Sequence, residues 1–224
     1  MIQRVLILVE GQTEERFVKD VLNPVFSLRN LAFNATILTT KRVKNGPDFK
    51  GGVTTFGKFR NDALRLLSRS NNALVTTLLD YYGLPADFPG MKTRPTGTAI
   101  RRVTHVERAI AESFDSPPNF LPFLALHEFE AWIFSSPNEL PKMMTPDSHA
   151  QSRFGKICSE FATPEEINER PEHSPSKRIA AIFPVYRKTI HGPTAIKRIG
   201  LDRIRARCPH FNEWLAKIES FSSR

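Results

Sequence analysis

The sequence has little cysteine and no long apolar segment, and both shortages exclude classes of protein. Its 224 residues include two cysteines, Cys158 and Cys208, which lie far apart and in no pair with metal-ligand spacing. Both are therefore expected to be free thiols in a reducing compartment. No apolar run approaches the roughly 20 residues that span a bilayer, and Glu10, Glu14 and Glu15 interrupt the N-terminal segment before any signal-peptide pattern. We expect a cytoplasmic protein with no membrane partner.

Acidic residues are also scarce in the last part of the chain. The whole chain carries a net charge of +9, from 32 Lys and Arg against 23 Asp and Glu. Residues 174–224 hold eleven basic and three acidic side chains, a net charge of +8, so the other 173 residues, with 21 basic and 20 acidic side chains, carry only +1. A basic surface at one end is typical of proteins that bind a polyanion, most often nucleic acid. Ordinary solubilising charge is the alternative.

Four apolar segments alternate with amphipathic ones, which predicts strands separated by helices. The predicted strands are residues 5–9, 31–40, 73–79 and 120–126; the predicted helices lie between residue 12 and Pro24 and over 59–68 and 99–114. This order predicts an α/β fold with a parallel sheet flanked by helices. Beyond Trp132 the pattern becomes helical. We therefore predict an α/β domain over residues 1–135 and a helical, basic extension over residues 136–224 packed on it.

Three of the predicted strands run into a carboxylate. Glu10 follows the first, Asp80 the third and Glu128 the fourth. The carboxyl ends of parallel strands lie at one edge of the sheet, where such sheets bind ligands, so these acids are expected to meet. Hard cations such as Mg²⁺ prefer oxygen ligands and need only one or two carboxylates plus a substrate phosphate. The pattern predicts a Mg²⁺ (or Mn²⁺) site for phosphoryl transfer or phosphodiester hydrolysis; a solvated or capping acid is the alternative for Glu10.

Four segments of the chain resemble known families. They are residues 10–14 (Glu-Gly-Gln-Thr-Glu), 80–83 (Asp-Tyr-Tyr-Gly), 127–131 (His-Glu-Phe-Glu-Ala), and 199–202 with 208–211. The first two resemble the Toprim domain of topoisomerases, primases and overcoming-lysogenization-defect-type nucleases. All four in order resemble more closely a Toprim-like bacterial family named domain of unknown function 4276. The resemblance implies a Toprim-like, Rossmann-like sheet of about four mostly parallel strands flanked by helices.

The resemblance also implies a Mg²⁺-dependent site. Glu10 matches the Toprim glutamate that acts as general acid or base, and Asp80 matches the first aspartate of the Asp-x-Asp metal motif. The second aspartate position is Tyr82, a poor Mg²⁺ ligand, so another acid is needed. Glu128 is the candidate replacement, and Glu130 follows two residues later. In an extended segment these two glutamates share a face, whereas in a helix they diverge by about 200°.

Other candidate residues have structural alternatives. Glu14 is a further candidate metal ligand, but an acid in a first helical turn explains it as well. His127 beside Glu128 is a candidate catalytic residue, although a lone histidine at a strand end is more often structural. Lys177 and Arg178, at a predicted helix start, are candidate phosphate-binding residues. Further nucleic-acid contacts are expected from Lys41, Arg42, Lys197 and Arg198.

The expected function is a metal-dependent nuclease acting on DNA or RNA. Glu10 is expected to be the general acid or base, Asp80 and Glu128 metal ligands, and the basic tail a nucleic-acid clamp. Similar families are often encoded beside an ATPase with defence-like roles, so the resemblance implies an ATPase partner in a bacterial defence system. A catalytically inactive scaffold that binds nucleic acid or an ATPase is the alternative, for which Tyr82 argues. A nucleotidyl- or phosphotransferase would use the same acids, but no glycine-rich phosphate loop is recognisable.

Overall fold

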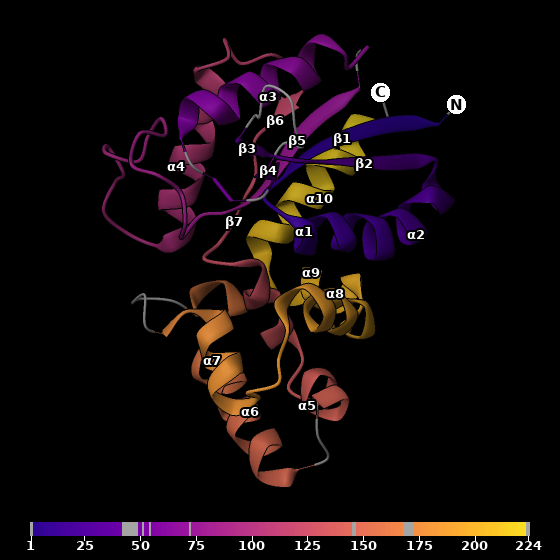
Figure 1. Cartoon of the computed structure of the whole chain (residues 1–224), viewed down its shortest axis with the longest axis vertical. Coiled ribbons are helices and arrows are strands. Elements are labelled where there is room, and N and C mark those ends of the chain that lie inside the picture. Colours follow the sequence, from indigo (N-terminus) through magenta and orange to yellow (C-terminus); the bar gives the residue numbers. More distant parts are fainter. Residues whose placement is uncertain are drawn as a thin grey trace.

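A parallel sheet forms the upper part of the molecule, and helices from the second half of the chain form the lower part (Figure 1). The computed structural model describes residues 2–41, 49–50, 52–53, 55–71, 73–144, 147–167 and 173–222. The strands follow the order β2 (Leu31–Ile37), β1 (Gln3–Val9), β5 (Leu74–Asp80) and β6 (Phe120–Leu121), with β7 (Leu124–Ala125) also paired to β5. All of these pairings are parallel. The predicted α/β fold with a Rossmann-like sheet is therefore confirmed.

The predicted fourth strand, residues 120–126, is divided in two. Pro122, which has no backbone N–H to donate to a sheet, lies between β6 and β7. Two shorter strands, β3 (Thr39–Lys41) and β4 (Phe49–Lys50), pair antiparallel in a small second sheet. The main sheet therefore has five strands.

Helices connect and cover these strands. Those of the first half are α1 (Gln12–Phe17), the π-helical η1 (Val18–Leu22), α2 (Asn23–Phe26), the 3-10 helix η2 (Ser27–Arg29), α3 (Phe56–Ser68) and α4 (Ala99–Glu112). Those of the second half are η3 (Phe129–Ser135), α5 (Glu139–Met144), α6 (Ser148–Glu160), η4 (Pro164–Glu166), α7 (Pro175–Ile182), α8 (Lys188–Ile199), α9 (Leu201–Arg207) and α10 (Pro209–Ser222). The predicted helical C-terminal part is confirmed. None of the described helices is long and apolar enough to cross a bilayer.

The sheet separates two apolar clusters, because alternate residues of a strand point to opposite faces. Val5, Ile7 and Val9 belong to one cluster, with residues of α1, η1 and the C-terminal helices. Leu8 belongs to the other, with residues of α3 and α4. This coverage of both faces explains why residues 5–9 are apolar throughout.

The helical segment after β1 continues past Pro24, so the prediction that this proline limits it is wrong. Residues 18–22 form a π-helical stretch, and a new short helix, α2, then starts with Pro24 in its first turn. Proline is tolerated there because a first-turn amide has no intrahelical partner. Asn23 ties this turn to β2, since its side chain accepts from the N–H of Phe33 at 2.8 Å and donates to the Phe33 carbonyl at 2.9 Å.

The last helix, α10, packs directly on the sheet. Trp214 stacks on Phe123 with ring centroids 4.4 Å apart and 10° between the planes, and its indole N–H donates to Thr76 Oγ1 at 2.9 Å. The buried carboxylate of Glu165 accepts from two backbone N–H groups at the start of α10, both at 2.9 Å. One apolar cluster thus runs from β1 to α10. The division into residues 1–135 and 136–224 stays a prediction.

Candidate functional site

Glu10 and Glu14 lie where β1 turns into α1. Glu10 is the first residue after β1, and its Oε2 accepts from the backbone N–H of Asp80 at 3.1 Å. The N–H of Glu10 in turn donates to the Leu78 carbonyl at 3.2 Å, so the ends of β1 and β5 are held side by side. Glu14 is only 4% exposed and accepts from the N–H of Gly11 at 2.9 Å, one half of a capping box.

Asp80 brings the segment after β7 against the end of β5. Its Oδ1 accepts from the backbone N–H of Phe129 at 2.9 Å. Glu128, extended and partly exposed, precedes this residue, and its Oε2 accepts from the N–H of Ser176 in the first turn of α7 at 2.9 Å. Glu130 follows it inside η3 and is completely buried. The two glutamates therefore lie on either side of a helix start.

A lysine that sequence reasoning missed lies among these acids. Lys188 is the first residue of α8, and its Nζ lies 3.4 Å from Asp80 Oδ2 and 3.0 Å from Glu130 Oε2. The second contact is an ion pair without hydrogen-bond geometry, since Glu130 Oε2 has no hydrogen-bond partner among the described atoms. The Tyr186 hydroxyl donates to the other oxygen of Glu130 at 3.5 Å. The side chain of Lys188 remains 41% exposed, so solvent reaches this side of the acid cluster.

Gly192 allows α8 to approach the site closely. A Cβ atom at this position would lie 3.1 Å from the hydroxyl oxygen of Tyr186 and 3.4 Å from the ring of Phe129. Helix α8 packs against both α1 and η3, and Figure 1 shows it below the sheet next to α1. This packing places Lys188, one turn before Gly192, against the carboxylates of the strand ends.

Burial and mutual repulsion raise the pKa of four of the acids. Burial and then the charge of Asp80 raise the pKa of Glu10 to about 7 and that of Glu14 to about 8. Burial raises the pKa of Glu130 to about 7 and also raises the pKa of Asp80, in both cases against the opposing effect of Lys188. Burial lowers the pKa of Lys188, but Asp80 and Glu130 outweigh it and raise that pKa above its usual range. One ammonium group therefore does not neutralise the cluster, which retains protons at neutral pH.

Oxygen donors of this kind suit a hard divalent cation. Mg²⁺ and Mn²⁺ prefer carboxylate ligands, and Glu130 Oε2 is a buried oxygen with no hydrogen bond among the described atoms. In the part of the chain that the structure describes, however, no three His, Cys, Asp or Glu side chains are arranged as a group that could hold a metal ion. The donor chemistry fits such an ion, whereas the arrangement with Lys188 paired to Asp80 and Glu130 is not a preformed metal shell.

Tyr82, two residues after Asp80, is 44% exposed. Its backbone N–H donates to the carbonyl of His127 at 3.1 Å, which ties the loop after β5 to the segment that carries Glu128. The tyrosine therefore contributes through its backbone to the position of Glu128. Its ring extends into solvent.

The residues predicted to bind nucleic acid lie on several elements. Lys177 on α7 and Lys197 and Arg198 in the last turn of α8 are exposed. Arg178 is partly buried: its Nε donates to the His173 carbonyl at 2.8 Å, and its guanidinium lies 5.3 Å from the centroid of the Phe161 ring. Lys41 ends β3, and Arg42 lies outside the described residues. Arg178 therefore has a structural role whether or not it also contacts a ligand.

Comparison with known proteins gives a family and no activity. The family model described as Domain of unknown function (DUF4276) matches residues 9–219. That range includes every acid of the cluster, Lys188 and most of α10. No curated protein and no solved structure matches the chain significantly.

Proposed function

The chain belongs to the DUF4276 family, a domain of unknown function, so we propose its activity from the chemistry of the site: metal-dependent hydrolysis of phosphodiester bonds in DNA or RNA. One observation carries the proposal. Glu10, Glu14, Asp80 and Glu130 are crowded at the carboxyl edge of the sheet with pKa values raised by burial. Crowding like charges away from water costs stability, and groups with strongly perturbed pKa values concentrate at functional sites.

Glu10 suits proton transfer. Burial raises its pKa to about 7, close to neutral pH, and a group with such a pKa suits both proton acceptance and proton donation. It also lies at the open edge of the sheet and is only partly buried. These properties agree with the general acid or base role that the Toprim resemblance implies for this residue.

Asp80, Glu128 and Glu130 are the residues that would hold Mg²⁺ or Mn²⁺, with Glu10 and Glu14 beside them. Such an ion, when bound, would neutralise charge on the phosphate and make a bound water more acidic. Lys188 would have to leave Asp80 and Glu130, and its flexible, partly exposed stem permits this. Its ammonium group would then be available to a phosphate oxygen of the substrate.

The nucleic-acid strand would approach over the basic helices. Lys177, Lys197 and Arg198 are exposed on α7 and α8, the helix that also carries Lys188. Phosphate contacts from lysine and arginine supply most of the affinity for a nucleic-acid backbone. An ATPase partner in a bacterial defence system remains a proposal that rests on the family resemblance alone.

A cleavage assay tests the proposal. Purified full-length protein should cleave DNA or RNA in Mg²⁺ or Mn²⁺ and not in EDTA. Asp80→Asn and Glu10→Gln should each lower the rate by 100-fold or more, on the order expected for loss of an acid–base or metal-binding group. Glu15→Gln, at an exposed position in the same segment, should cleave like wild type and serves as the control.

A catalytically inactive scaffold is the rival function, and the hydrogen bonds of the acids favour it. Asp80, Glu128 and Glu14 each accept a backbone N–H at the start of a helix, which is a structural use of a carboxylate. Absence of cleavage with every metal and substrate, together with nucleic-acid binding that Asp80→Asn leaves unchanged, would establish the scaffold instead.

A further inference from the structure

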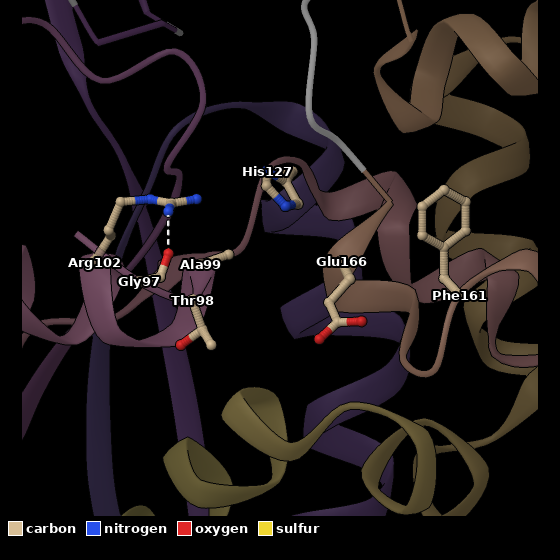
Figure 2. Close-up of a pocket in the computed structure, with 7 residues that line it drawn as sticks. All are labelled: Gly97, Thr98, Ala99, Arg102, His127, Phe161 and Glu166. Atoms are coloured by element: carbon tan, nitrogen blue, oxygen red, sulfur yellow. Dashed lines mark hydrogen bonds between the residues drawn. The ribbon is translucent and has the colours of Figure 1, made fainter.

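A pocket of about 570 Å³ opens between the start of α4 and the segments that carry His127 and Phe161. It is lined by Gly97, Thr98, Ala99, Arg102, His127, Phe161 and Glu166. Figure 2 shows Arg102 and Thr98 on one side, Phe161 on the other, and His127 and Glu166 between them. The volume falls within the range of small-molecule sites, about 300 to 1,000 Å³. One of its lining residues, His127, directly precedes Glu128 in the chain.

His127 is held in this pocket at some conformational cost. It is 7% exposed, and its φ of 67° is uncommon for a residue other than glycine. Its imidazole is hydrogen-bonded to the backbone of Glu165, which fixes the ring in the lining of the pocket.

The side of the pocket formed by α4 is suited to a phosphate. Ala99 is the first residue of this 14-residue helix, whose N-terminal N–H groups attract anions. Arg102, in the first turn, is fixed by a hydrogen bond from its guanidinium to the Gly97 carbonyl. Other guanidinium N–H groups remain to donate to phosphate oxygens.

The opposite side is suited to a flat ring with hydrogen-bond donors. Phe161 is partly exposed, and Arg178 lies over its ring at 5.3 Å from the centroid. Aromatic side chains of this kind stack on nucleobases. The exposed carboxylate of Glu166 is an acceptor and disfavours a bare anion on this side of the pocket. A nucleotide suits both sides of the pocket, because it carries a phosphate at one end and a flat base with N–H groups at the other.

We propose that this pocket binds one nucleotide of the nucleic-acid strand, with its phosphate at the start of α4 and Arg102 and its base against Phe161. The proposal rests on the proposed function, since it identifies how a strand is held beside the acids. The base has access to the acceptor oxygens of Glu166, so bases with an amino group are favoured.

Binding measured without metal tests the pocket separately from catalysis. In EDTA, a fluorescently labelled five-nucleotide strand is bound to the full-length protein and displaced by AMP, adenosine or inorganic phosphate. AMP should compete at least tenfold better than adenosine or phosphate. Equal competition by AMP and phosphate would reduce the pocket to an anion site and overturn the proposal.

Variants of the lining residues locate the binding. Phe161→Leu keeps apolar bulk but removes the ring, and it should weaken strand and AMP binding about tenfold, within the range for loss of one base–aromatic stack; Phe161→Tyr should bind like wild type. Arg102→Ala should weaken binding. It should also reduce the slope of log K against log salt concentration by about one, as expected for the loss of one phosphate contact. Arg108→Ala removes the same charge from an exposed position further along α4 and should have no effect.

Glu166→Gln provides a test that does not depend on packing, because this side chain is exposed. It should reduce the preference for AMP over IMP, whose base lacks the amino group. Unchanged AMP binding in Phe161→Leu and in Glu166→Gln would overturn the nucleotide pocket even if the wild-type protein cleaves nucleic acid. Weaker AMP binding in Phe161→Leu and a smaller preference for AMP over IMP in Glu166→Gln would support the pocket even if cleavage is never observed.

Discussion

Replacing Glu14 with glutamine tests the electrostatics of the site most directly. Glutamine has the same shape, and its side-chain oxygen still accepts the N–H of Gly11, now 2.9 Å from Glu14 Oε2. Only the charge is lost. Because folding raises the pKa of Glu14 from 4.5 to about 8, the folded protein binds this proton more tightly than the unfolded chain, and the carboxyl group lowers stability as the pH rises.

The magnitude follows from the shift. At about 1.4 kcal/mol per pKa unit, a carboxyl group with a pKa of 4.5 unfolded and about 8 folded lowers the free energy of unfolding by about 3 kcal/mol at pH 7 and by at most about 5 kcal/mol above pH 8. The loss begins near pH 4.5 and is complete above pH 8. Glu14→Gln should therefore match wild type near pH 4 and exceed its stability by at least about 1 kcal/mol at pH 8.

Urea unfolding in EDTA at fixed pH values from 4 to 9, followed by tryptophan fluorescence, measures this difference. Glu15→Gln is the matched control, since the adjacent residue lies in the same helical turn and is exposed; its stability difference from wild type should not change over this range. A Glu14→Gln protein that is less stable than wild type at pH 8, or a difference that does not vary with pH, would refute the electrostatic account of the cluster.

Three further substitutions test the ion pairs of Lys188, the close packing at Gly192 and the hydrogen bonds that Glu165 accepts. Lys188→Met removes the cation and should lower the free energy of unfolding by about 1 to 3 kcal/mol at pH 8, and by less at pH 5, where the acids are more fully protonated; an equal loss at both values in urea titrations would contradict the ion pairing. Gly192→Ala places a Cβ 3.1 Å from the Tyr186 hydroxyl oxygen, so it should cost about 1 to 3 kcal/mol by overpacking, and the double variant with Tyr186→Phe should recover much of that loss. Glu165→Gln presents an amide N–H to one of the two backbone donors that start α10, so it should destabilise the protein by about 1 to 3 kcal/mol, whereas Glu166→Gln next to it should not.

The framework of the site was predictable because it rests on strong local patterns. Residues 74–80 are buried in the sheet, as are residues 5–9 apart from the partly buried Leu6, and apolar runs with β-branched residues mark such strands. Once these strands are parallel, the acids that follow them must meet at one edge, as Glu10 and Asp80 do. The continuation of the helix past Pro24 was not predictable in this way, because a π-helical stretch leaves no pattern in the apolar spacing.

The electrostatic partner of the site could not be read from the sequence. Lys188 lies 108 residues after Asp80 in a tail that contains ten other basic residues, and no local pattern distinguishes it from them. Lys188 reaches the acids because it is the first residue of α8 and because Gly192 lets this helix pack closely. The only signal in the sequence was Gly192, six residues after Tyr186. A glycine there indicates close helix packing only when the neighbouring helices are known.

Asp80 links the segment that follows β7 to the lysine among the acids. One of its oxygens accepts from Phe129 and so positions the segment that carries Glu128 and Glu130, while the other pairs with Lys188. Asparagine can still accept the N–H of Phe129 but cannot form the ion pair with Lys188, whereas alanine removes both contacts. Asp80→Asn should therefore keep the fold near the wild-type stability at pH 7 and lose cleavage, and Asp80→Ala should also be destabilised by about 1 to 3 kcal/mol, because a buried backbone donor loses its acceptor. Equal stability of the two variants in urea unfolding would show that Asp80 does not position Glu128 and Glu130.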